Sequence, residues 1–310
     1  MENTRAKTTR NSLILLLTAA IWGMAFVSQS KGMDYMHPFT FNGVRSLIGA
    51  ASILVYILIS RKIAGDKAAK LDWKLNVKAG LLCGIFLTIA STLQQFGIKY
   101  TSVGKAGFIT TLYIIFVPIF GIFLRKKVAP VVWAAAVMAA VGMYLLCMTE
   151  SLRLGAGDIM VFLCAIAFAI QIMTVDHYAA RIDGAVVSCI QFTVCGVACC
   201  VGALIWGQPT FGQLQEGMGA LLYAGVLSCG VGYTLQIVGQ KGLNPTVAAL
   251  IMSLESVIAT ISGWIAYKIG FLTTDQTLTL RQIAGCVIVF AAVILVQLPP
   301  EWFRFGKKNA

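Results

Sequence analysis

The chain has 310 residues, of which 58% are apolar and only 12% are charged, and its mean hydropathy is +0.84. A soluble domain carries about 25% charged residues, so this composition excludes a water-soluble globule. The formal net charge of +12 would indicate nucleic-acid binding in a soluble protein. In this chain the basic residues lie mainly in the predicted loops, and no nucleic-acid partner is expected.

The apolar residues arrive in blocks of about 20, the length of a helix that crosses a hydrocarbon core of about 30 Å. Helices are expected because a lone strand leaves its backbone unpaired in lipid, and the blocks do not alternate as barrel strands do. We therefore predict an all-α membrane protein with ten transmembrane helices, arranged as two inverted five-helix repeats. The helices are expected at residues 12–30, 38–60, 77–98, 104–124, 130–149, 156–175, 184–206, 217–238, 244–267 and 281–298.

One segment of the first half returns without a gap in the second half. Residues 92–113 (TLQQFGIKYTSVGKAGFITTLY) and residues 234–255 (TLQIVGQKGLNPTVAALIMSLE) share eight identities at an offset of 142 positions. Apolar identities arise easily by chance in such a chain, but matched polar residues such as Gln94 and Gln236 do not. The pattern indicates a duplicated unit.

The predicted spans divide into five and five, with the joint at residues 150–157. Because five is odd, the second unit enters the membrane from the opposite side, as in many secondary transporters. The expected domains are a first five-helix repeat at 1–149 and a second at 156–298. Residues 299–310, where aromatic and basic residues mix, are expected to form a cytoplasmic interfacial tail, with a partner-binding segment as the alternative.

The N-terminal block resembles the charged and apolar regions of a signal peptide. We interpret it as an uncleaved first span, because the repeat would otherwise lack a helix. Lys and Arg then give the orientation, since one set of alternate loops holds 17 of them and the other set six. Both termini are therefore expected in the cytoplasm, with the chain multi-pass in the cell (inner or plasma) membrane.

Two charged residues, Arg45 and Glu255, lie well inside predicted spans. A charge at membrane depth costs at least about 2.5–3.5 kcal/mol, so such residues normally face a cavity and have partners. Their estimated depths differ by only about 4 Å, so a pair is geometrically allowed. Glu255 is predicted to exchange a proton or bind a cationic group of the solute, or else to be structural. Arg45, on one helical face with Asn42, is either a solute contact or a residue that locks the fold.

Four further residues are candidates for a central pocket. Gln94 and Gln236 occupy matching repeat positions, and their amides would either line the pocket or bond between the halves. Trp22 and Tyr113 would wall it, and Tyr113 occupies the repeat position of Glu255. In addition, Pro118 is expected to kink its span, and the glycines at 230, 232 and 239 to let the eighth span bend.

Several short motifs, degenerate alone but specific in their order, carry a family resemblance. They are Ala20-Ile21-Trp22-Gly23, Arg45, Leu93-Gln94-Gln95, Gly107-Phe108-Ile109-Thr110, Leu112-Tyr113, Val117-Pro118, Ser253-Leu254-Glu255-Ser256 and Gly263-Trp264. In this order the chain resembles the drug/metabolite transporter superfamily, EamA family, over nearly its whole length. The resemblance implies carriage of small metabolites across the membrane, often outward. The Gly-Glu pair with which family members commonly close spans 4 and 9 is missing here.

No nucleotide-binding loop or hydrolase motif occurs, and the only two histidines, His37 and His177, fall on opposite predicted faces. No enzyme activity, cofactor or metal site is expected. The expected function is a secondary active transporter of small metabolites across the plasma membrane, exporting amino-acid-like solutes by alternating access, with proton coupling left open. The alternatives are an exporter of hydrophobic cations or drugs and a passive facilitator of the same fold. The expected partners are a small-molecule solute and the lipid bilayer, and both a monomer and a homodimer remain open.

Overall fold

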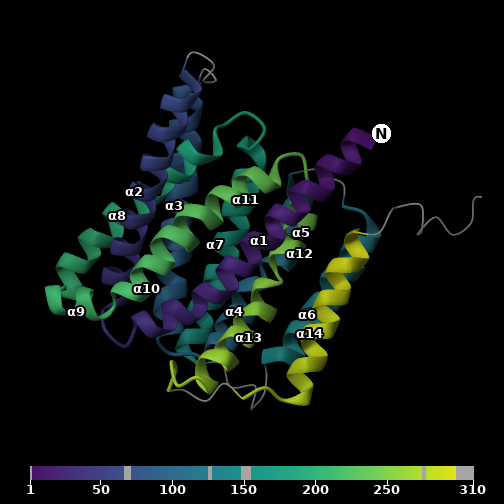
Figure 1. Cartoon of the computed structure of the whole chain (residues 1–310). Helices are drawn as coiled ribbons and strands as arrows, with labels where there is room; N and C mark the ends of the chain where they lie inside the picture. The colour runs from purple at the N-terminus through teal and green to yellow at the C-terminus, as the bar shows by residue number, and fades with distance from the viewer. Residues whose placement is uncertain (1, 66–70, 125–127, 148–154, 274–276, 298–310) are drawn as a thin grey trace, which may run out of the picture.

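A computed structural model describes residues 2–65, 71–124, 128–147, 155–273 and 277–297, and the predicted tail at 299–310 lies outside these ranges. All regular secondary structure in the described residues is helical (Figure 1). Two elements, η2 and η3, are π-helices with wider turns. The elements are α1 (Glu2–Gly32), α2 (Pro38–Ala64), α3 (Trp73–Ile98), α4 (Val103–Thr111), α5 (Tyr113–Phe123), α6 (Pro130–Cys147), α7 (Ala156–Tyr178), α8 (Gly184–Gly202), η2 (Ala203–Gly207), α9 (Phe211–Glu216), α10 (Met218–Leu222), η3 (Tyr223–Gly232), α11 (Tyr233–Gln240), α12 (Pro245–Met252), α13 (Glu255–Lys268) and α14 (Leu280–Gln297).

Eight helical segments of the described chain are long and apolar enough to cross a membrane. They occupy the positions of the predicted spans 1–4 and 6–9. The other two predicted spans, 130–149 and 281–298, correspond to shorter apolar helices at Pro130–Leu145 and Leu280–Leu295. The prediction of a multi-pass all-α membrane protein is therefore confirmed, with eight crossings supported by helix length and composition.

The helix starts follow from local sequence. Pro38 and Pro245 each occupy the first turn of a helix, where a missing N–H costs nothing. Asn244 caps α12 by accepting a hydrogen bond from the backbone N–H of Thr246, and Asp183 caps α8 in the same way. The prolines therefore mark helix starts, as predicted.

The helices pack in pairs that join the two halves of the chain. α2 packs on α8, α3 on α7 and α6 on α14, while α1 packs on α11 and α13. In Figure 1, α6 and α14 stand side by side at one edge of the bundle. Their approach is close because both are lined with small residues, and a Cβ added at Gly142 would lie 2.9 Å from the carbonyl oxygen of Gly285.

Two of the spanning segments are interrupted midway. The fourth breaks at Leu112, between α4 and α5, and the ninth breaks at Ser253 and Leu254, between α12 and α13. Leu112 and Leu254 are related by the repeat offset of 142. Pro118 lies inside α5, six residues after the break at Leu112, and the kink expected at this proline stays a prediction. Interrupted helices are typical of transporter binding sites.

The glycines of the eighth span let neighbouring helices approach closely, and the bending expected at them stays a prediction. A Cβ at Gly230 would lie 2.7 Å from Ser52 Oγ, one at Gly232 would lie 2.6 Å from Trp22 Nε1, and one at Gly239 would lie 2.8 Å from Leu15. These positions bring α1 and α2 close to η3 and α11. The irregularity in this span is the π-helix η3 itself, and such wide turns often occur at functional sites.

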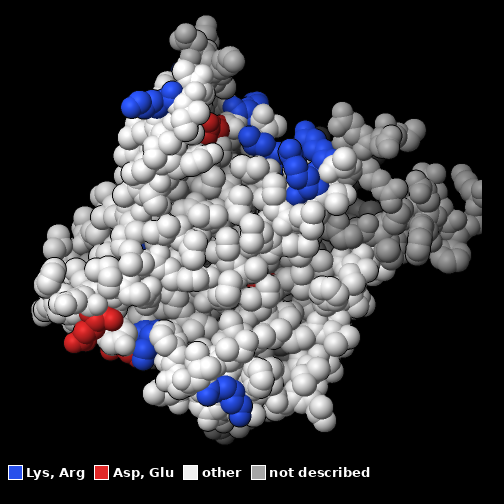
Figure 2. All heavy atoms as spheres, in the orientation of Figure 1, with Lys and Arg blue, Asp and Glu red and all other residues white. Residues whose placement is uncertain are grey.

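Basic side chains gather at one end of the bundle. Figure 2 shows most of the visible Lys and Arg at the end where α1 begins. The connections from α2 to α3, α7 to α8 and α11 to α12 lie at this end. Arg61 in the last turn of α2 and Lys74 in the first turn of α3 flank the first connection, and Arg181 and Lys241 lie in the other two. This arrangement is the one expected if that end faces the cytoplasm.

Candidate functional site

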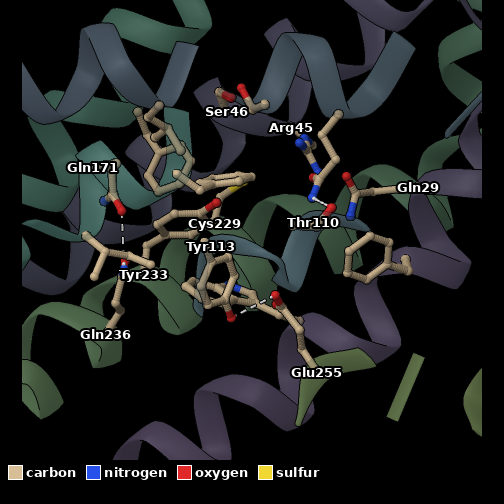
Figure 3. A pocket seen from close by; sticks show the side chains of 18 residues that line it. Gln29, Arg45, Ser46, Thr110, Tyr113, Gln171, Cys229, Tyr233, Gln236 and Glu255 are labelled. Atoms are coloured by element: carbon tan, nitrogen blue, oxygen red, sulfur yellow. Dashed lines mark hydrogen bonds between the residues drawn. The ribbon is translucent and has the colours of Figure 1, made fainter. Parts of the chain in front are cut away.

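A polar cavity lies among the helices at the middle of the bundle (Figure 3). Its volume is about 40 Å³, which is room for on the order of three water molecules. Segments of both halves contribute to it. It is lined by Trp22, Phe26, Gln29, Arg45, Ser46, Leu87, Ser91, Gln94, Thr110, Tyr113, Phe168, Gln171, Ile172, Phe192, Cys229, Tyr233, Gln236 and Glu255.

Six of the seven site residues predicted from sequence line this one cavity: Trp22, Arg45, Gln94, Tyr113, Gln236 and Glu255. The structure does not bring Asn42 to the cavity. Asn42 is buried on α2, and its side-chain amide donates to the backbone carbonyl of Ser91 at 2.8 Å. It therefore ties α2 to α3.

Glu255 and Tyr113 face each other across the two halves. The Tyr113 hydroxyl donates to Glu255 Oε1 at 3.0 Å, and both residues are buried. They are separated by 142 positions, and each is the first residue after the break in its span. The two breaks thus place one phenol and one carboxylate at the centre of the bundle. A carboxylate at the start of α13 is also favoured by the helix dipole.

Arg45 lies on another wall of the cavity and is only 5% exposed. Its guanidinium carbon lies 5.4 Å from the centre of the Phe41 ring, which stabilises a buried cation. Its Nε has no hydrogen-bond partner among the residues that the structure describes. In the described residues the ion pairs are Lys31–Asp34 and Lys105–Asp158, so the allowed pairing of Arg45 with Glu255 does not occur. Figure 3 shows the two side chains apart.

The amides bond within their own halves. Gln94 Nε2 donates to Thr110 Oγ1 at 3.2 Å, and Gln236 Nε2 donates to Gln171 Oε1 at 3.3 Å. Trp22 does join the halves, since its indole N–H donates to the carbonyl of Ser228 at 3.4 Å. Gln94 and Gln236 therefore both line the pocket. In the described chain their side-chain hydrogen bonds stay within their own halves.

Most of the lining consists of residues related by the repeat offset. Twelve of the 18 lining residues form six pairs that lie 142 positions apart. The pairs are Phe26/Phe168, Gln29/Gln171, Leu87/Cys229, Ser91/Tyr233, Gln94/Gln236 and Tyr113/Glu255. Sequence reasoning missed Gln29, Gln171 and the two phenylalanines. Extending the ungapped comparison to residues 25–30 and 167–172 would have found them, because Phe26/Phe168 and Gln29/Gln171 are identities.

The two ends of the bundle differ. At the end where α1 begins, a groove of about 620 Å³ runs between α2, α8 and α11, and Ala64, Arg181 and Val238 are among its lining. The positions related to these three by the repeat offset of 142 lie at the opposite end. They hold Trp206 in place of Ala64, Phe39 in place of Arg181 and Phe96 in place of Val238.

These three aromatic residues pack against one another at the opposite end of the bundle. The Phe39 and Phe96 rings lie 5.1 Å apart, and the Phe39 and Trp206 rings stack at 5.5 Å. His37 lies 5.5 Å from Phe96. We call Phe39, Phe96 and Trp206 the aromatic cluster. Burial, with Lys99 nearby, lowers the pKa of His37, so the neutral imidazole is favoured beside these rings.

Comparison with known proteins now decides the family. The model of the EamA-like transporter family matches residues 10–148 and again residues 155–298. The chain belongs to the EamA-like transporter family. The resemblance read from the sequence is thus confirmed, and the chain is a transporter of the drug/metabolite type.

Several proteins are similar to this chain over nearly its whole length. An uncharacterized transporter of Archaeoglobus fulgidus is 28% identical over 92% of this chain and 84% of its own length. The uncharacterized transporter YoaV of Bacillus subtilis is 20% identical over 95% of this chain and 97% of its own. A protein of known crystal structure superposes with a TM-score of 0.73 at 16% identity, covering 96% of this chain and 99% of that one. This likeness concerns the fold.

Proposed function

We propose that this EamA-like transporter is a secondary carrier in which one central cavity, shared by two inverted repeats, holds the solute. The observation that carries the proposal is the cavity lining, in which twelve of 18 residues are pairs related by one offset. In inverted-repeat carriers the solute site lies near the midplane at the repeat interface. A cavity built from equivalent positions of two halves has the geometry of such a site.

The repeats of the proposal are residues 1–149 and 156–298, with five crossings each and both termini in the cytoplasm. The helix contacts support it. α1 packs on α11 as α7 packs on α3, and α1 packs on α13 as α7 packs on α5. The pairs α2–α8 and α6–α14 join equivalent helices. A two-fold axis that relates the two halves would produce this set of contacts. The double match of the family model supports the same division of the chain.

The difference between the two ends supports alternating access. In an inverted repeat, a structure open at one end is converted to one open at the other when the two halves exchange conformations. Here a groove lies at the basic end, and the aromatic cluster occupies the equivalent positions at the opposite end. We infer that transport requires the aromatic cluster to separate. The present cavity, with room for only a few waters, must also widen to admit a solute.

The charges support an amino-acid-like solute. Arg45 and Glu255 line the same cavity without pairing with each other. Buried charges of opposite sign on separate walls are costly unless a ligand bridges them. A zwitterion does so, with its carboxylate at Arg45 and its ammonium group at Glu255. Movement outward, as an exporter, and exchange of a proton at Glu255 are further parts of the proposal.

Crosslinking the aromatic cluster is expected to stop transport. The variant carries Phe39→Cys on α2 and Trp206→Cys on η2, so that the crosslink joins the two halves. Treated with a short bifunctional thiol reagent that can be cleaved, the protein in proteoliposomes should retain less than a tenth of its solute flux. Cleavage of the reagent should restore the flux.

The two variants that carry only Phe39→Cys or only Trp206→Cys are the control, because they hold the same nine native cysteines and lack the introduced pair that ties the halves. They should keep most of their flux after treatment. Full flux in a doubly substituted protein whose crosslinking is verified by mass spectrometry would show that this end need not open, and would reject alternating access through it.

A further inference from the structure

The cavity holds buried polar groups that have no partner within the described chain. They are Gln29 Oε1, Arg45 Nε, Gln171 Nε2 and Gln236 Oε1. All four side chains are nearly inaccessible, with Gln171 at 0% and Gln236 at 1% exposed. Buried amides and guanidinium groups in proteins are normally hydrogen-bonded, so unpaired ones in a cavity wall point to a ligand or to water that a ligand replaces.

Gln171 and Gln236 together present one donor and one acceptor. Their mutual bond uses one amide N–H and one amide oxygen. Whichever way the two amides are oriented, this bond leaves a nitrogen on one residue and an oxygen on the other without a partner. The two free groups are neighbours because the amides are bonded at 3.3 Å. An uncharged carboxamide, which carries C=O and N–H side by side, has the complementary pattern.

The charged groups lie at the other side of the cavity. Figure 3 shows Arg45 and Gln29 on the side opposite to Gln171 and Gln236. Tyr233 and Phe192, whose ring centres lie 4.9 Å apart, also line the cavity. A zwitterionic head held by Arg45 and Glu255 would therefore extend its side chain past aromatic rings toward the glutamine pair. Gln29 Oε1 is an acceptor available to the ammonium group of that head.

We propose that Gln171 and Gln236 determine specificity by binding an uncharged carboxamide on the side chain of a zwitterionic solute. The inference rests on the proposed function, because it takes the head group to lie between Arg45 and Glu255. A site built to hydrogen-bond a polar group discriminates strongly against an analogue without it, since its own buried groups then stay unpaired. Aliphatic zwitterions of equal length are therefore poor ligands.

The test measures binding of L-glutamine and of L-norleucine to the purified full-length protein by isothermal calorimetry. L-norleucine has a similar length and no carboxamide. The wild type should bind L-glutamine at least tenfold more tightly. Gln171→Met, which keeps the side-chain length, should remove this preference by weakening L-glutamine binding and leaving L-norleucine binding within twofold.

Gln191→Met is the matched control. Gln191 is also fully buried, and both of its side-chain polar atoms are unpaired, but it does not line the cavity. This variant should keep the wild-type preference. Equal binding of both solutes by the wild type, or an unchanged preference in Gln171→Met, would overturn the carboxamide assignment and leave the zwitterion carrier standing. Failure of both solutes to bind the wild type would reject the zwitterionic solute and the carboxamide assignment with it.

Discussion

Glu255→Gln is expected to lower solute flux in proteoliposomes by about 10- to 100-fold. Glutamine has nearly the same shape, and its amide oxygen still accepts the hydrogen bond that Tyr113 donates to Glu255. What it removes is the charge and the proton. A hydrogen bond to a charged group contributes about 1.5–3 kcal/mol, and 1.4 kcal/mol corresponds to a factor of ten.

The measurement is flux over a series of pH values. A residue that exchanges protons gives the wild type a pH dependence that the glutamine variant lacks. Tyr113→Phe is the companion variant, since it removes only the hydroxyl that donates to Glu255. Its flux should fall by about tenfold or less. An unchanged rate and pH profile in Glu255→Gln would make this residue structural.

The second large effect is expected from Arg45→Met, which should abolish measurable binding of a zwitterionic solute while the protein stays folded. Replacement of a buried charge by an apolar side chain of similar volume is often neutral or stabilising. The melting temperature should therefore be unchanged or higher, because Arg45 forms no ion pair within the described part of the chain. Binding and melting temperature are both measured on the purified variant.

These two readouts separate the two roles predicted for Arg45. If Arg45 contacts the solute, the variant loses solute binding and keeps its melting temperature. If Arg45 locks the fold, the melting temperature of the variant falls. Lys62→Met, at an exposed site on the same helix, removes an equal charge outside the cavity and should change neither quantity. A variant of Arg45 that melts well below the wild type and still binds the solute would assign this residue to the fold.

Much of the fold could be predicted because hydrophobic block length and charge placement are local properties of the sequence. The helix interruptions could not be, because no glycine or proline stands at Leu112 or Leu254. They are turns in the middle of apolar segments. Pro118 lies six residues after the break in its span, so its position does not mark that break.

The site was predicted in outline for a similar reason. Polar residues deep in apolar helices must face a cavity or a polar partner. This requirement alone selected Arg45, Glu255 and Gln236 as candidates for one site. It does not say what they face, so Asn42, which bonds a neighbouring backbone, passed the same criterion. From sequence, the depth of a residue along its helix can be estimated, but its position in the plane of the membrane cannot. Arg45 and Glu255 lie at similar estimated depths and were therefore compatible with an ion pair, but the structure places them on separate walls of the cavity.

Solute counterflow in proteoliposomes tests most directly whether the central cavity carries solute between the two sides. The solute is first identified by the rise in melting temperature that it causes in the purified protein, in a screen of amino acids, nucleosides, polyamines and drugs. Vesicles preloaded with unlabelled solute should then take up labelled solute to a transient excess, and Glu255→Gln vesicles should show no such excess. Uptake that rises to equilibrium without the excess would indicate a passive channel, and an excess of equal size in the variant would place transport outside this cavity.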